Sequence, residues 1–244
     1  MILPNVRMSF GRTEARWLVR LLSGSDAGRQ RHWEGVLADR GIDALLDDPW
    51  VADAVLEPRG ILLAPPRLAL YVLIRRAFLD RGLESRMLAD YTTALVHEFG
   101  MRGRSYRVAD HDDKEYYYLV DVLADLANAE GRRAFLLRAH LGNFALWLSG
   151  LFPDYIVARL HRKGGPGIDY YEEMGRTGFL LAARDPHASH QSLERLYESA
   201  AETFPAIRRA LNLFSDQHLL PVTRSPAERF LRQVADDFES GRHA

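Results

Sequence analysis

The pattern of apolar and polar positions along the chain predicts a protein built of helices. Apolar residues recur three and four positions apart, as in 13–22, where Trp17, Leu18 and Leu21 share one face and arginines occupy the other. We find no convincing stretch in which apolar and polar residues alternate as they do in a half-buried strand. We therefore expect an all-α globular fold of about ten helical segments, too many for a simple four-helix bundle.

Glycine, proline and capping residues predict where these helices begin and end. Ser25 or Asp26 can cap a helix that stops at Gly41, and Pro65-Pro66 opens a helix over 67–81 that stops at Gly82. The same signals and periodicity predict further helices over 43–46, 50–56, 84–99, 115–129, 134–152, 154–162, 169–184, 189–203, 205–219 and 226–239.

The longest apolar run, residues 134–152, predicts the helix at the centre of the fold. It is apolar almost all round, which is typical of a buried helix. Its length approaches that of a membrane span. However, Arg138, His140 and Asn143 lie within it, and a charged residue deep in a bilayer costs roughly 2.5 kcal/mol or more. We expect a core helix of a soluble protein that does not contact a membrane.

A strip of small residues predicts a close helix contact. Gly175, Gly178 and Ala182 lie three and four positions apart in the expected helix over 169–184. Each glycine costs about 1 kcal/mol relative to alanine within a helix, so the packing must offset that cost. We expect the backbone of a neighbour, the central helix, to approach this strip.

The chain is long enough for a single domain with a large core. We expect one all-helical domain over 1–244, and the polar loop 102–114 is where a subdivision would fall. Asp39-Arg-Gly-Ile-Asp recurs as Asp80-Arg-Gly-Leu-Glu, so 39–56 and 80–97 are either a duplicated unit or two examples of a common helix stop. The second interpretation is favoured, because we find no third copy.

Composition limits the classes of function. The net charge is −1, which does not favour nucleic acid or an anionic membrane as a partner. Only two of the 32 basic residues are lysines, an arginine-rich, bacterial-type composition typical of a GC-rich genome. The absence of cysteine excludes disulfides, thiolate ligands and a cysteine nucleophile. No secretion signal is recognisable at the start of the sequence, so we expect a cytoplasmic protein.

The sequence contains no motif that specifies a reaction. No glutamate is followed by histidine three positions later, and neither His-Glu-x-x-His nor Gly-x-Ser-x-Gly occurs. His187 and His190 are three apart, but further metal ligands are missing around them. We expect no metal and no cofactor, and whether the protein is an enzyme is left undecided.

The polar residues of the central helix are the candidate site. At about 100° per residue, His140 and Asn143 lie about 60° apart on one face, where they could line a pocket. Arg138 lies about 160° from His140, and could pair with Asp121, Asp125 or Glu172. The candidate ligand-binding residues are His140, Asn143, Tyr170, Tyr171, Arg138 and His161. The competing interpretation, a buried network that fixes the helix register, is favoured.

Three hypotheses of function follow. The first is a non-catalytic protein that acts through a protein partner or as a homo-oligomer. The alternative is an enzyme or small-ligand binder with a pocket against the central helix, formed by His140, Asn143 and Tyr170. A weaker alternative is nucleic-acid binding through the arginine face of Arg12, Arg16 and Arg20.

Overall fold

The protein is all-α, as the periodicity predicts. A computed structural model describes the chain except residues 58–59, 61–62, 102–103, 110–111 and 220–244. Within the described residues there are thirteen α-helices, several short 3-10 or π turns and no strand. The helix expected over 226–239 lies outside the described residues.

The helices follow one another with short connections, so most of the described chain is helical. Their bounds are α1 Arg12–Ser23, α2 Ala27–Arg40, α3 Ile42–Leu46, α4 Pro49–Leu56, α6 Pro66–Asp80, α7 Arg86–Val96, α8 Leu119–Leu126, α9 Gly131–Leu151, α10 Pro153–Lys163, α11 Ile168–Ala183, α12 Pro186–His190, α13 Glu194–Glu202 and α14 Phe204–Phe214. Shorter turns are η1 Arg7–Ser9, η2 His97–Met101, η3 Arg104–Tyr106 and η4 Ser215–Leu219.

Capping residues begin and end these helices as expected. Asp26 caps α2 by accepting hydrogen bonds from the N–H groups of Gly28 and Arg29. Gly41 and Gly82, the glycines of the two similar segments, both have positive φ. The segments differ after them, because Gly41 leads into the short α3 whereas residues 83–85 are not helical. The similar residues of 39–56 and 80–97 therefore correspond to two helices that each end at a glycine.

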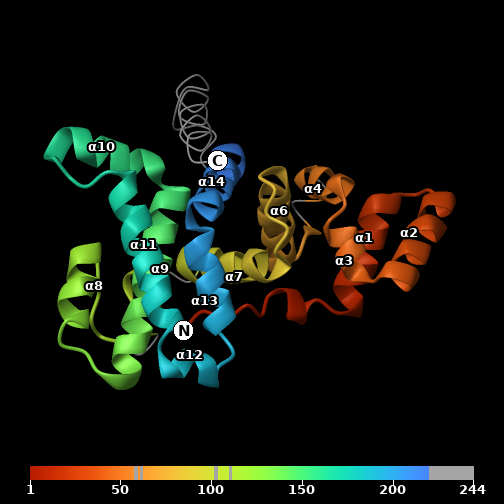
Figure 1. Ribbon diagram of the computed structural model, residues 1–244. Helices are drawn as coiled ribbons and strands as arrows, with labels where there is room; N and C mark the ends of the chain where they lie inside the picture. Colours follow the sequence, from red (N-terminus) through yellow and green to blue (C-terminus); the bar gives the residue numbers. More distant parts are fainter. Residues whose placement is uncertain (58–59, 61–62, 102–103, 110–111, 220–244) are drawn as a thin grey trace.

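Helix α9 is the central buried helix. Fourteen of its 21 residues are buried, and α11, α14, α8 and α10 pack against it. Figure 1 shows α9 among α11, α13 and α14, with α1 to α4 on the far side of α6. Among the described residues, no helix combines the length and the apolar character needed to cross a membrane.

Helices α9 and α11 meet at two glycines, which confirms the predicted close contact. A Cβ on Gly178 would lie 2.6 Å from the backbone nitrogen of Gly142 and 2.9 Å from the carbonyl oxygen of Arg138. A Cβ on Gly142 would in turn lie 2.6 to 2.7 Å from the ring of Phe179. Both positions lack room for a side chain because the helix surfaces interlock there.

The first ten residues form an extended arm that crosses the molecule, as Figure 1 shows. Ile2, Val6 and Phe10 are buried, and Phe10 packs edge-on against Tyr71 of α6. The arm is also held by polar contacts, because the N–H of Arg7 donates to the Asp90 carboxylate of α7 at 2.8 Å. Burial raises the pKa of Asp90, and the hydrogen bond from Arg7 partly offsets the rise.

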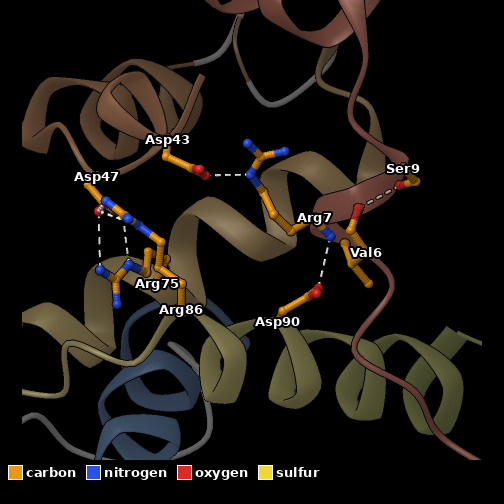
Figure 2. A network of polar contacts seen from close by, with 8 residues as sticks. All are labelled: Val6, Arg7, Ser9, Asp43, Asp47, Arg75, Arg86 and Asp90. Carbon is orange, nitrogen blue, oxygen red and sulfur yellow. Dashed lines mark hydrogen bonds and ion pairs between the residues drawn. The ribbon is translucent and has the colours of Figure 1, made fainter. Parts of the chain in front are cut away.

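A second set of ion pairs fastens the N-terminal helices to α6 and α7. Figure 2 shows Asp47 between Arg75 and Arg86, with Arg7 reaching Asp43 nearby. Arg75 is 3% exposed and donates to Asp47 at 2.7 Å and to the Glu84 carbonyl at 2.9 Å. Burial raises the pKa of Asp47, but the hydrogen bonds from Arg75 and Arg86 outweigh it and leave the pKa below its usual value. The network joins segments distant in sequence.

One expected helix is divided in the structure. Residues 189–203 were expected to form one helix, but α12 and α13 are separated at 191–193, where Ser192 has a positive φ of 56°. Asp185 starts α12 earlier than expected by accepting a hydrogen bond from the N–H of His187. The single domain over 1–244, with 102–114 as the place where a subdivision would fall, stays a prediction.

Substitution of Gly178 tests the close contact between α9 and α11. Gly178→Ala should lower the free energy of unfolding by about 1–3 kcal/mol, because the new methyl group meets backbone atoms that cannot rotate away. The matched control is Gly35→Ala in α2, where a Cβ meets nothing within 4 Å. That change should raise the free energy of unfolding by about 0.5–1 kcal/mol. Urea unfolding measures both changes in the free energy of unfolding. If the two variants change it equally, the close contact of α9 and α11 at Gly178 is contradicted.

Candidate functional site

The predicted pair His140 and Asn143 does lie on one side of α9, but it lines only a very small space. Both residues are buried, at 4% and 5% exposure. They line a cavity of only about 10 Å³, whose outer wall includes Met1 and Ile2 of the arm. A space of that size holds about one water molecule. The space beside the pair is therefore too small for a ligand larger than water.

His140 is surrounded by aromatic rings. Its imidazole stacks on Phe144 at 5.7 Å between ring centroids, and Phe99 and Tyr116 lie 5.8 and 5.9 Å away. Burial lowers the pKa of His140 to about 3, and the nearby Arg104 charge adds to the effect. The ring is therefore neutral at ordinary pH. Its Nε2 has no hydrogen-bond partner among the described residues.

Asn143 belongs to a buried network. Its Oδ1 accepts a hydrogen bond from the Tyr91 hydroxyl of α7 at 2.5 Å. Burial raises the pKa of Tyr91, so its hydroxyl stays protonated and available as a donor. This contact fixes α9 against α7, which is what a structural role for Asn143 requires.

Arg138 pairs with an acid that the sequence argument did not name. Its Nη1 lies 2.5 Å from Asp185, whose other oxygen contacts His187 at 2.8 Å. The suggested acids were wrong, since two of them have other contacts: Asp125 is bonded by Tyr116, Lys114 and Arg133, and Glu172 by Arg208. Asp185 was missed because it follows α11, and only the fold places it beside α9.

The remaining candidate residues do not line the cavity beside His140. Tyr170 and Tyr171 pack against each other edge-on at 5.8 Å on α11, and Tyr171 is buried. His161 is exposed in the last turn of α10. Arg12, Arg16 and Arg20 are exposed on α1, so nucleic-acid binding there stays a prediction. Among the described residues, no cluster of three or more histidine, aspartate or glutamate side chains could hold a metal.

A larger pocket opens one to two turns further along α9. We call it the aromatic pocket, and its volume is about 410 Å³. Its walls come from α9, α10, the η3 turn and the residues directly before α8. The lining residues are Ser105, Tyr106, Tyr117, Tyr118, Phe144, Trp147, Leu148, Phe152, Tyr155 and Arg159.

Helix periodicity places one half of this lining. Phe144, Trp147 and Leu148 are spaced three and four positions apart, so they share a face of α9. Tyr155 and Arg159 are spaced by four on α10 and likewise share a face. Because α10 begins directly after α9, the two faces meet at the pocket.

A buried tyrosine places the other half. Tyr116 is fully buried, and its backbone N–H donates to the Tyr106 carbonyl at 2.8 Å. Its hydroxyl contacts Asp125 and accepts from Arg133 at 2.6 Å. With Tyr116 anchored, Tyr117 and Tyr118 remain half exposed, and the rings of Tyr106 and Tyr117 lie 4.8 Å apart. The run of three tyrosines thus divides into one anchor and two pocket residues.

The aromatic pocket offers flat ring surfaces against which a ligand can pack. Four tyrosines, two phenylalanines and one tryptophan supply rings, and tyrosine rings combine an apolar face with a polar hydroxyl. Arg159 is the charged side chain of the described lining, and its guanidinium carbon lies 4.4 Å from the centre of the Tyr118 ring. These groups suit a planar ligand.

The aromatic pocket was not predicted, although its residues carried a signal. Tyr116-Tyr117-Tyr118 follows directly on the most polar stretch of the chain, and these residues precede α8 although the sequence predicted a helix from 115. Three adjacent aromatic residues beside a polar loop could have indicated a surface site.

Comparison of the chain with protein-family models, curated proteins and solved structures finds no match.

The burial of His140 generates a prediction about pH. In the unfolded chain a histidine binds a proton below about pH 6.5, whereas folded His140 stays neutral, so acid favours unfolding. His140→Phe should remove this contribution. Between pH 8 and pH 5 the variant should lose about 2 kcal/mol less free energy of unfolding than the unchanged protein.

Urea unfolding at the two pH values measures this difference. His161→Gln is the matched control, because His161 is exposed on α10 and is solvated in both the folded and the unfolded chain. The control should keep the pH dependence of the unchanged protein. An unchanged pH dependence in His140→Phe would show that His140 is not held neutral.

Proposed function

We propose that the protein binds a small planar molecule in the aromatic pocket. The observation that carries this is the convergence of seven aromatic side chains on a space of about 410 Å³. Ligand pockets span about 300–1,000 Å³ and are lined mostly by apolar and aromatic side chains with a few polar groups. The aromatic pocket lies against the central helix, as the small-ligand hypothesis expects, but it is not lined by the His140, Asn143 and Tyr170 of that hypothesis.

The exposure of the lining supports binding from solvent. Tyr117, Tyr118 and Tyr155 are 54%, 46% and 54% exposed, although each is large and mostly apolar. Trp147 and Phe152 also line the pocket, with ring centroids 5.4 Å apart. A flat ligand that enters would cover the tyrosine faces and gain about 0.5–1.5 kcal/mol for each ring it packs against.

Fluorescence of N-phenyl-1-naphthylamine, an uncharged planar probe, tests this proposal. We expect saturable binding of one probe per chain. Tyr155→Ala should weaken it about three- to tenfold, because one packing ring is lost. Tyr155 is more than half exposed, so its truncation should leave the fold intact.

The control variant must exclude binding elsewhere. Leu219→Ser changes a side chain of a second, apolar groove, which shares Trp147 with the aromatic pocket but is otherwise lined by different residues, and should leave probe affinity unchanged. If Leu219→Ser weakens binding and Tyr155→Ala does not, the probe sits in the groove and the proposal is wrong. No saturable binding would also overturn it.

We infer a second candidate function, pairing of two copies, from that groove. It has a volume of about 630 Å³ and lies between α4, α6, α9 and η4. Leu56 and Leu219 at its edge are 38% and 46% exposed. Among its described lining residues none is an acid, lysine or arginine, and burial lowers the pKa of His218. A two-fold axis would bring the exposed rims of two such grooves, Leu56 and Leu219 of each copy, into an uncharged contact.

Sedimentation equilibrium tests the pairing. We expect the unchanged protein to sediment as a dimer at micromolar concentration, and Leu56→Glu combined with Leu219→Glu to sediment as a monomer, because two charges would be buried in the contact. Val120→Glu is the matched control, since Val120 is 60% exposed on α8 and does not line the groove. A monomeric unchanged protein contradicts pairing.

A further inference from the structure

The charge in the aromatic pocket distinguishes among classes of planar ligand. Arg159 is partly buried on α10, and its guanidinium lies over the Tyr118 ring at 4.4 Å. The side chain also packs beside Gly165, where a Cβ would lie 3.2 Å from its Cγ. The Tyr118 ring thus positions the guanidinium at the wall of the pocket, and the lack of a side chain at Gly165 leaves room for the Arg159 stem.

The described lining contains no carboxylate to balance this charge. The nearby acid Glu115 is bonded by Arg107 at 2.6 Å and by the Tyr117 hydroxyl. Those hydrogen bonds hold the pKa of Glu115 below its usual value, so it is charged but already partnered. The positive charge of Arg159 therefore faces the pocket without an opposing acid in the wall.

We propose that the ligand of the aromatic pocket is an aromatic acid, with its rings among the tyrosines and its anionic group at Arg159. This inference rests on the proposed function. A guanidinium presents a planar fork that pairs with two oxygens of a carboxylate, sulfonate or phosphate group. Because Tyr118 already holds the guanidinium, little side-chain freedom is lost when the anion binds.

The same geometry disfavours a cationic ligand. Rings that surround a quaternary ammonium group attract it through their negative faces. Here the face of Tyr118 is already occupied by Arg159, and a second positive charge in the same pocket would be repelled. The aromatic pocket is thus suited to anionic ligands.

Two probes with the same aromatic skeleton test the inference. 1-Anilinonaphthalene-8-sulfonate carries a sulfonate that N-phenyl-1-naphthylamine lacks. We expect the sulfonate to bind at least fivefold more tightly than the neutral probe at low salt. Arg159→Gln should weaken sulfonate binding about tenfold and leave binding of the neutral probe within about twofold.

Matched variants locate the effect. Arg162→Gln removes an exposed arginine of the same helix and should change neither affinity. Arg159→Lys keeps the charge without the planar fork and should give an intermediate sulfonate affinity. Circular dichroism establishes that each variant is folded. If Arg159→Gln does not fold, two other measurements show whether Arg159 binds the sulfonate. One compares Arg159→Lys with the unchanged protein, and the other measures the loss of sulfonate affinity with added salt.

The outcomes separate the two proposals. If both probes bind at the aromatic pocket with equal affinity, and Arg159→Gln weakens neither selectively, ligand binding stands and the preference for an acid is overturned. If neither probe binds, or both are lost only in Leu219→Ser, the proposed function and the inference fail together. Selective loss of sulfonate affinity in Arg159→Gln supports both.

Discussion

The backbones of α9 and α11 touch at Gly142 and Gly178, and the arrangement of the remaining helices depends on that contact. Two helices that approach this closely cannot slide or rotate without moving backbone atoms into each other. The contact therefore sets which residues of α9 face inward. Gly142 faces α11, so the opposite side of α9 carries His140 and, one to two turns further along, the residues Phe144, Trp147 and Leu148 that line the aromatic pocket.

Polar groups on α9 then divide by environment. Asn143 finds a partner in Tyr91, and Arg138 finds one in Asp185, so these groups hold α9 against its neighbours. His140 differs, because burial keeps it neutral and its Nε2 has no partner among the described residues. His140 and Asn143, the polar pair that the sequence singled out, are thus buried, and the larger pocket further along α9 is lined mainly by aromatic rings.

Sequence reasoning succeeded where the determining interactions are local. The 3.6-residue period predicted α9, the strip at Gly178 predicted its close neighbour, and Asp26 predicted a cap. It failed where the partners lie far apart in the chain. Tyr106 and Tyr117 meet because Tyr116 anchors their loop to Asp125, and Arg159 joins them from another helix. Helical periodicity contains no information about such loop closures, so it predicted α9 but not the loop and α10 residues that line the aromatic pocket beside it.

The extended arm has a consequence for how the chain folds. Arg7 bonds to Asp90, 83 positions later, and Met1 and Ile2 line the cavity beside His140. During synthesis, at about 5–20 residues per second, these arm residues leave the ribosome seconds before the surfaces that bury them exist. Contacts over such long separations slow folding, because the ends of a long loop must meet before the contact stabilises anything. The arm is therefore made well before the surfaces of α7 and α9 that bury it.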